Sequence, residues 1–156
     1  MIIADTPIGR LAITGHNGIL SQIRMAKSEE MDAGVEPVEQ EAVRQIKAYF
    51  DGRLQRLSLP YELEGSAFER KVWEELAEVP YGCVVSYGEL ANRCCMPGAA
   101  RAAGRACGRN PMLILIPCHR VVGTDGRLTG FAAGMEAKAA LLEHEGHKVL
   151  QNRIIK

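Results

Sequence analysis

The alternation of apolar and polar residues predicts β-structure in the first part of the chain. Strand-like runs lie within Ile2–Met25, and two turns interrupt them: Pro7–Gly9 turns the chain before Leu11–Ile13, and His16–Gly18 supplies a hairpin turn before Ile19–Ile23. Asn and Gly suit such turns because they tolerate positive φ. The pattern therefore predicts an antiparallel meander.

Helical spacing replaces this pattern further along the first part. Residues 27–40 are polar, contain Gly34 and Pro37, and are expected to form a loop. The residues that follow share one helical face before a stop at Asp51-Gly52, namely Val43, Ile46, Lys47 and Phe50. Leu57–Leu63 is expected to be a further strand or an extended arm.

A capping box marks the start of the second part. Ser66 and Glu69 have the spacing at which each side chain accepts a hydrogen bond from the backbone NH of the other. After it, one helical face continues as far as Pro80-Tyr81-Gly82 and carries Phe68, Val72, Leu76 and Val79. The sequence therefore predicts a helix here and a domain boundary near Glu64-Gly65.

The next segment predicts a helix-turn-helix. A second capping box, Ser86–Glu89, opens a short helix through Arg93, residues 94–98 form a turn, and a further helix covers Ala99–Arg109. This order of elements matches a helix-turn-helix: two helices are joined by a short turn that contains glycine, and the second helix is basic. In that motif the second helix lies along DNA.

The second of these helices is small and basic. Arg101, Arg105 and Arg109 follow one another at four-residue intervals, and no acidic residue occurs from 96 to 124. A solvated surface helix without a ligand is the alternative, but the lack of acidic residues favours DNA. Its small residues, which let a backbone approach closely, include Ala100 and Gly104.

A thiol and an imidazole stand side by side at the end of an apolar run. Asn110-Pro111 stops the preceding helix, Leu113–Ile116 is expected to be a brief buried strand, and Cys118-His119 follows. A cysteine becomes nucleophilic when a cationic or hydrogen-bonding neighbour favours its thiolate, as His119 and Arg120 are able to do. The alternative is a structural cysteine that packs as a small hydrophobe, which is the commoner role in an apolar run.

The C-terminal part predicts a loop and a last helix. Gly123–Gly126 is a turn, Thr129–Gly134 is a loop able to wall a pocket, and a helix covers Met135–Glu145 before Gly146. Glu145 thus lies in the final turn, where the helix dipole disfavours a carboxylate. A charge in an unfavourable place suggests a functional role.

The composition narrows the class of protein. With 156 residues, 47% of them hydrophobic, the chain suffices for one ordinary domain or two small ones. No apolar run approaches the roughly 18 residues that span a bilayer, and no secretion signal is present, so we expect a cytoplasmic protein with no membrane partner. Five cysteines without regular spacing argue for reduced thiols.

The formal net charge of zero conceals an asymmetry between the two parts. Residues 1–65 carry seven basic and ten acidic side chains, whereas residues 66–156 carry twelve and nine. The second part is therefore the better candidate for contact with a polyanion.

These residues leave several functions open. A metal site is discounted, since adjacent cysteines cannot chelate as C-x-x-C does and no second ligand pair follows. A Cys-dependent enzyme acting on nucleic acid remains, as does a winged-helix DNA-binding regulator with a thiol sensor such as Cys94-Cys95. A Cys-His hydrolase would need an oxyanion hole, for which the sequence offers no sign.

The residues around Cys118 resemble the active-site signature of the O6-alkylguanine-DNA alkyltransferases. The signature is Pro117-Cys118-His119-Arg120-Val121, preceded by Asn110-Pro111 and followed by the segment Leu141–Gly146. The likeness runs from about Phe68 to Gly146, and the pentapeptide is very specific to that family. The resemblance implies an α+β protein with a small RNase H-like N-terminal domain, residues 1–64, followed by an all-helical winged helix-turn-helix C-terminal domain, residues 65–156.

The resemblance also implies an activity. The implied protein is a DNA repair protein that flips O6-alkylguanine, mainly O6-methylguanine, out of double-stranded DNA. O4-methylthymine is a further candidate substrate. The alkyl group then passes irreversibly to Cys118, as in a single-turnover methylated-DNA–protein-cysteine S-methyltransferase. We expect a monomer that needs no cofactor.

By the same resemblance, six residues have roles in this reaction. Cys118 is the alkyl acceptor, His119 its base through a bridging water, and Glu145 the carboxylate that orients His119. Asn110 matches a hinge asparagine that hydrogen-bonds turns around the site. Tyr87 matches a tyrosine whose hydroxyl donates to the purine, and Arg101 an arginine that fills the gap left by the extruded nucleotide.

The resemblance extends to a base pocket and to a DNA-binding surface. The pocket residues are Tyr87, Cys118, Val121, Phe131, Ala132 and Ala133, with the carbonyls of Cys118 and Val121 and the amide of Ala132 reading the guanine edges. The DNA contacts are Ala100, Arg101, Gly104, Arg105, Arg109 and Tyr87. Two features depart from the family pattern: Phe131-Ala132-Ala133 stands where Tyr-Ser or Tyr-Gly is common, and the cysteines that bind structural zinc in some relatives are absent.

Overall fold

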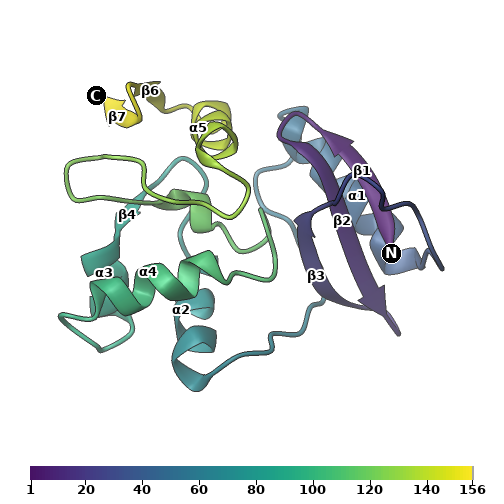
Figure 1. Ribbon diagram of the computed structural model, residues 1–156, viewed down its shortest axis with the longest axis horizontal. Helices are drawn as coiled ribbons and strands as arrows, with labels where there is room; N and C mark the ends of the chain where they lie inside the picture. Colours follow the sequence, from purple (N-terminus) through teal and green to yellow (C-terminus); the bar gives the residue numbers. More distant parts are fainter. Residues whose placement is uncertain (156) are drawn as a thin grey trace. The chain divides into compact units, whose positions relative to one another are not determined.

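The computed structural model describes residues 1–155, which form two compact units (Figure 1). The first holds Met1–Leu63 together with Pro111–Leu115, and the second holds Glu64–Asn110 and the chain from Ile116 onward. Strands and helices are both present, so the α+β class is confirmed. The predicted domains, 1–64 and 65–156, did not anticipate that residues 111–115 pack with the first unit.

The first unit is a three-stranded antiparallel sheet covered by one helix. β1 (Ile2–Thr6), β2 (Gly9–His16) and β3 (Ile19–Met25) lie in the order β1-β2-β3, so the predicted meander is confirmed. α1 (Pro37–Phe50) covers one face of this sheet (Figure 1). The fully buried side chains of the unit include Leu11, Ile13, Leu20, Ile23, Ile46 and Tyr49.

The loop expected over residues 27–40 is shorter than predicted because α1 begins at Pro37. A proline at the first helical position has no NH to leave unsatisfied, and its fixed φ already suits a helix. The Glu39 side chain also accepts a hydrogen bond from the Glu36 backbone NH at 3.1 Å. The helix therefore has its own start signal, which the presence of Pro37 had obscured.

Two segments join the sheet through single bridges. Residues 57–63 form the extended arm that was one of the two expected structures, with Leu20 bridged to Tyr61. The expected strand over Leu113–Ile116 is wrong, because Met112 makes one bridge to Ile23 and the chain then turns at Ile114, whose φ is 70°. Apolar character alone had indicated a strand, and burial accounts for it: Ile114 is 4% exposed.

Helices are the main regular elements of the second unit. They are α2 (Ala67–Ala77), α3 (Tyr87–Arg93), α4 (Ala100–Gly108), the short 3-10 helix η1 (Cys118–Arg120) and α5 (Met135–His144). The reciprocal capping box of Ser66 and Glu69 is confirmed, with both hydrogen bonds at 3.0 Å. Ser86 caps α3 by accepting from the Glu89 NH at 3.1 Å.

α4 is the centre of the predicted helix-turn-helix. Both α2 and α3 contact it, and α3 leads into it through the turn at residues 94–98. The Trp73 indole of α2 donates to the Ala106 carbonyl of α4 at 2.8 Å, in a buried contact. Packing and this hydrogen bond therefore hold α4 in place, while Arg101 and Arg105 of the same helix are exposed.

The all-helical description of the C-terminal domain is wrong, since this unit also contains strands. β4 (Val85–Ser86) pairs in parallel with β5 (Val121–Val122), and β6 (Lys148–Leu150) forms a hairpin with β7 (Arg153–Ile155). The hairpin turn is Gln151-Asn152, with φ of 52° and 57°, as a two-residue turn of this kind requires. Strands of two or three residues lack the length at which an alternating pattern becomes visible.

Over residues 1–155, no helix combines the length and the apolar character needed to cross a membrane.

Candidate active site

Cys118 is the first residue of η1 and is buried, with 3% of its surface exposed. Asn110, at the end of the segment that follows α4, donates from Nδ2 to Cys118 Sγ at 3.0 Å and to the Ile116 carbonyl at 2.7 Å. One amide group thus contacts both the sulfur and the turn that presents it. The structure therefore brings together two residues that the family resemblance had placed in the site.

The environment of the Cys118 sulfur has opposing effects on its ionisation. Burial, the largest effect, raises the pKa of the thiol to about 11, while the Asn110 hydrogen bond and the positive charge of Lys138 act in the opposite direction. At neutral pH the resting side chain is therefore a thiol. Reaction as a nucleophile requires a group that takes its proton.

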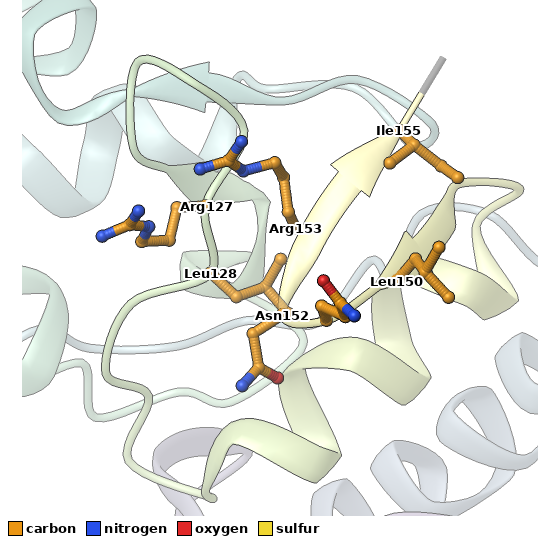
Figure 2. A pocket seen from close by; sticks show the side chains of 7 residues that line it. Arg127, Leu128, Leu150, Asn152, Arg153 and Ile155 are labelled. Carbon is orange, nitrogen blue, oxygen red and sulfur yellow. The ribbon is translucent and has the colours of Figure 1, made fainter.

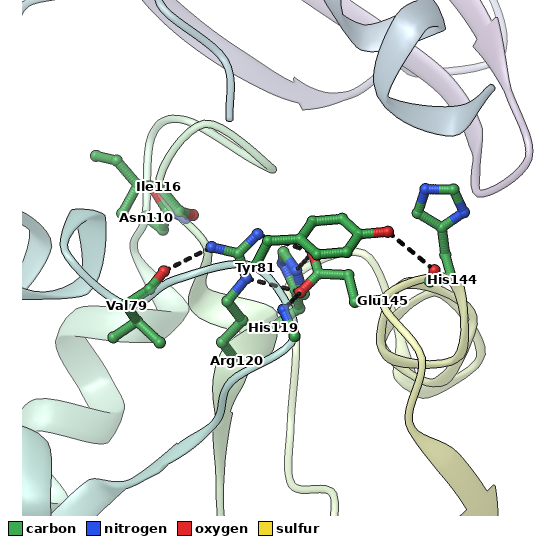
Figure 3. Close-up of polar contacts among 9 residues, drawn as sticks. Val79, Tyr81, Asn110, Ile116, His119, Arg120, His144 and Glu145 are labelled. Atoms are coloured by element: carbon green, nitrogen blue, oxygen red, sulfur yellow. Dashed lines mark hydrogen bonds and ion pairs between the residues drawn. The ribbon is translucent and has the colours of Figure 1, made fainter. Parts of the chain in front are cut away.

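The residue after Cys118 belongs to a buried ionic cluster that joins three segments of the second unit (Figure 3). His119 Nε2 lies 2.8 Å from Glu145 Oε2. Arg120 donates from Nε to Glu145 Oε1 at 2.8 Å and from Nη2 to Oε2 at 2.9 Å. The Gly82 NH also donates to Oε1, at 3.3 Å. One carboxylate therefore accepts from an imidazole, a guanidinium and a backbone amide.

Glu145 directly follows α5, where the helix dipole disfavours its charge. It is nevertheless 5% exposed, so it is not a solvated surface carboxylate. The two hydrogen bonds from Arg120 compensate the charge at a position where the helix does not. The unfavourable placement noted in the sequence thus has a structural explanation in Arg120.

His119 is fully buried, and its two ring nitrogens differ. Nε2 faces Glu145, whereas Nδ1 has no hydrogen-bond partner among residues 1–155. Burial lowers the pKa of the imidazole; Glu145 opposes this change, and the charges of Arg120 and Lys138 reinforce it. His119 is therefore neutral at pH 7, with one nitrogen available to accept a proton.

A second group of polar side chains surrounds Tyr87, which begins α3. Its hydroxyl hydrogen-bonds the Thr129 hydroxyl, and Lys138 Nζ donates to the Thr129 carbonyl at 3.3 Å. Lys138 Nζ also lies 5.9 Å from the centre of the Tyr87 ring. On α4, a Cβ at Gly104 would lie 3.6 Å from that ring, so the small residue permits close packing.

The remaining pocket residues lie on β5 and on the loop that leads to α5. Val121 is buried, Ala132 is exposed, and Phe131 and Ala133 are partly buried. The Phe131 ring meets the His119 ring edge-on, with 6.5 Å between centres. The loop thus comes close to the histidine, while Tyr87 contacts the same loop at Thr129.

The basic helix presents its arginines to solvent, but not all of them are unpaired. Arg101 and Arg105 are exposed and make no ion pair with any residue in 1–155. Arg109, just past the end of α4, pairs with Glu69 of α2 at 3.4 Å. The segment 96–124 contains no acidic residue, and the partner of Arg109 comes from a part of the chain that is distant in sequence. Ala100 and Gly104 are partly buried on the same helix.

Sequence reasoning assigned no role to Lys138 or to the buried position of Arg120. Lys138 has no exposed surface and occupies the buried side of α5 with Leu141 and Leu142. A lysine three and four residues from two buried leucines is a signal that the sequence does contain. Arg120 is part of the quoted signature, yet nothing local indicates that its partner is Glu145.

One pocket of this unit is lined by other residues. It has a volume of about 580 Å³ and is lined by the β6–β7 hairpin with Arg127 and Leu128 (Figure 2). No residue predicted for the site lines it. Among residues 1–155, no group of three or more His, Cys, Asp or Glu side chains is placed to hold a metal ion.

The buried lysine leads to a test by pH. Burial lowers the pKa of Lys138 from 10.5 to about 8, so keeping it charged in the folded protein reduces stability below pH 8, and this cost disappears as pH rises toward 10.5. We expect Lys138→Met to raise the free energy of unfolding at pH 7 by on the order of 2 to 3 kcal/mol.

The gain should shrink by about 1 kcal/mol between pH 7.5 and pH 9, as the wild-type lysine loses its proton. Denaturant unfolding of both proteins across this range measures the difference. A difference that stays constant with pH would show that Lys138 is not buried as a charge.

Comparison with known proteins places the chain in a family. The family model described as "6-O-methylguanine DNA methyltransferase, DNA binding domain" matches residues 67–147. The methylated-DNA–protein-cysteine methyltransferase of Mycobacterium leprae (strain TN) is 43% identical over 151 residues, covering 94% of this chain and 92% of that protein.

Two solved structures extend the comparison. Mycobacterium tuberculosis OGT in complex with DNA has a TM-score of 0.84 at 42% identity, covering 92% of this chain and 90% of that chain. S. pombe Atl1, in complex with damaged DNA containing O6-carboxymethylguanine, has a TM-score of 0.51 at 33% identity, covering 57% and 84%. The resemblance found in the sequence is confirmed, and the chain belongs to the 6-O-methylguanine-DNA methyltransferase family.

Proposed function

We propose that this protein repairs alkylated DNA by moving the alkyl group of O6-alkylguanine, mainly O6-methylguanine, onto its own Cys118. The observation that carries the proposal is the position of Cys118 Sγ, which accepts a hydrogen bond from the Asn110 amide at 3.0 Å. The next residue in the chain, His119, contacts Glu145 at 2.8 Å. Relatives named for this activity and a structural neighbour bound to DNA support it.

The chemistry requires a thiolate at a buried site. The Cys118 proton passes to Nδ1 of His119 through a bridging water, and Glu145 stabilises the resulting imidazolium. The sulfur then attacks the alkyl carbon, the bond between that carbon and O6 breaks, and the guanine leaves with its electron pair and takes up a proton. The product is a thioether, which does not react further, so each protein acts once.

The substrate must leave the DNA stack to reach this sulfur. An O6-alkyl group in a duplex lies inside the helix, and flipping its nucleotide costs a few kcal/mol, less for a badly paired base. We propose that α4 lies in the minor groove, with Ala100 and Gly104 allowing close approach and Arg105 and Arg109 near the phosphates. Arg101 would fill the gap left by the nucleotide.

The proposed pocket takes the flipped base beside Tyr87. The Tyr87 hydroxyl, now bonded to Thr129, would turn its proton toward the purine, while the carbonyls of Cys118 and Val121 and the amide of Ala132 read the base edge. Phe131-Ala132-Ala133 offers no side-chain hydroxyl in this loop. O4-methylthymine is a candidate second substrate.

We also propose a specific fold type for each of the two domains. The helix-turn-helix of α3 and α4 with the β4–β5 pair corresponds to a winged DNA-binding domain over residues 65–156. The sheet and helix of residues 1–64 correspond to an RNase H-like domain. We propose that the protein acts in the cytoplasm as a monomer on double-stranded DNA and without a cofactor.

The alternative, a DNA-binding regulator with a thiol sensor, fits the cysteines less well. Sensor thiols are accessible and have a low pKa. Cys118 is 3% exposed with a pKa of about 11, and burial also raises the pKa of Cys94. Cys118 and Cys94 therefore lack the properties of a sensor, whereas Cys95, the other residue of the candidate pair, is exposed.

Mass spectrometry tests the alkyl transfer directly. After incubation with duplex DNA that contains O6-methylguanine, we expect the intact protein to carry one added methyl group, and peptide mapping to place it on Cys118. Cys118→Ala should gain no methyl group. Cys83→Ala, which removes an exposed thiol outside the proposed site, should behave as the wild type. Repeated turnover with an unmodified Cys118 would contradict the proposal.

Arg101 provides a test of nucleotide flipping. Because a gap-filling side chain helps only when a base must leave a stack, Arg101→Ala should slow repair of duplex DNA by about tenfold or more. Its reaction with free O6-methylguanine base should stay close to that of the wild type.

The rates are measured under single turnover at saturating DNA, with Arg105→Ala as the matched variant. Arg105→Ala should weaken binding without this selective loss of rate. If Arg101→Ala slows both substrates equally, Arg101 has no part in flipping.

A further inference from the structure

Arg120 is held in one orientation by contacts on several sides. Its side chain is 8% exposed, and Nη1 donates to the Val79 carbonyl at 2.6 Å. The Tyr81 ring centre lies 5.9 Å from the guanidinium carbon. Its Nε and Nη2 meet the two carboxylate oxygens of Glu145 (Figure 3). A paired fork of this kind is the strongest and most directional form of an Arg–carboxylate contact.

This contact decides the protonation state of Glu145. A buried carboxylate beside a buried guanidinium stays ionised, because protonation would leave the guanidinium without a counter-charge. An ionised carboxylate only accepts hydrogen bonds. The 2.8 Å contact between Glu145 Oε2 and His119 Nε2 therefore needs a proton on Nε2.

The same logic extends to the other ring nitrogen. A neutral imidazole carries one proton, so a proton on Nε2 leaves the lone pair on Nδ1. Nδ1 is the nitrogen that has no hydrogen-bond partner within residues 1–155. The atom able to act as a base is therefore the one that faces away from the ionic cluster.

We propose that Arg120 is a positioning residue for alkyl transfer: by keeping Glu145 ionised, it holds His119 as the neutral Nε2–H tautomer, with Nδ1 ready to take the proton of Cys118. The inference rests on the proposed function, in which His119 is the base. Arg120 acts through Glu145 and has no assigned contact with the DNA or with the reacting atoms.

The charges around His119 show why the guanidinium matters. Glu145, after α5, favours the imidazolium, whereas Arg120 on η1 and Lys138 on α5 disfavour it. Cys118 is a neutral thiol, and Phe131 contributes only an aromatic edge. Without Arg120, the pair of His119 and Glu145 would take up one more proton at a higher pH. Whether that pair is an imidazolium beside a carboxylate or a neutral ring beside a carboxylic acid, Nδ1 then carries a proton and has no lone pair for the thiol proton.

A purely structural role makes a different prediction. If Arg120 only joins Val79, Tyr81 and Glu145, its loss would lower stability and leave the ionisation of His119 where it is. The tautomer of His119 and the pH dependence of the reaction separate the two roles.

The first measurement is made on the wild-type protein and uses a variant only to assign its signals. Nitrogen-15 NMR of the imidazole rings in the full-length wild-type protein, with His119→Gln to assign the signals, reports which nitrogen carries the proton. We expect a neutral ring with its proton on Nε2 at about pH 7. An imidazolium at that pH, or a proton on Nδ1 alone, would overturn the proposal.

The second measurement is the pH dependence of the single-turnover rate. In Arg120→Gln, the pH below which the rate falls should move upward by about one to three units, as expected when a neighbouring cation is removed. Arg120→Lys should restore part of the shift. Arg153→Gln, which removes an exposed arginine paired with Asp125, is the matched control and should follow the wild type.

The outcomes distinguish this inference from the proposed function. A wild-type protein that adds no alkyl group to Cys118 refutes the function, whereas transfer with an unshifted profile in folded Arg120→Gln refutes only the role of Arg120. If Arg120→Gln does not fold, Arg120→Lys and the NMR measurement decide between the two roles.

Discussion

The buried carboxylate of Glu145 is the constraint on which the rest of the candidate site depends. Removing a charge from water is costly unless partners compensate it. Here they come from the guanidinium of Arg120, the ring of His119 and the amide of Gly82. These groups lie on η1 and on the segment that follows α2, while Glu145 follows α5. The cluster therefore forms only when all three segments are folded together.

Cys118, the proposed alkyl acceptor, has the opposite requirement, because it must stay unreactive until a substrate arrives. Burial keeps Cys118 as a thiol with a pKa of about 11, and the Asn110 amide and the charge of Lys138 moderate that effect. A thiol of this kind resists adventitious alkylation. In the proposed reaction it depends on a base that is neutral at rest, and burial of His119 favours the neutral ring by lowering the pKa of its imidazole. Protection and activation thus arise from the same buried environment.

Structural features that depend on neighbouring residues could be predicted from the sequence, whereas pairings between distant residues could not. The β-meander, the Ser66 cap and the last helix, α5, follow from the spacing of residues and from turn residues within a few positions. The turn at Ile114, the pairing of Val85 with Val121 and the ion pair of Arg109 with Glu69 depend on partners distant in sequence. In the site, the signature pointed to Cys118 and His119, but the partner of Arg120 and the burial of Lys138 needed the fold.

The central claim, that the charge of Glu145 supports proton removal from Cys118, is tested most directly by the pH dependence of alkyl transfer in Glu145→Gln. The variant leaves Arg120 buried without a counter-charge, a loss of about 3 to 5 kcal/mol, so rates are compared where unfolding measurements show it folded. Because the imidazolium loses its counter-charge, the account predicts slower transfer at neutral pH, with recovery only at higher pH. An unchanged profile in the folded variant would contradict it.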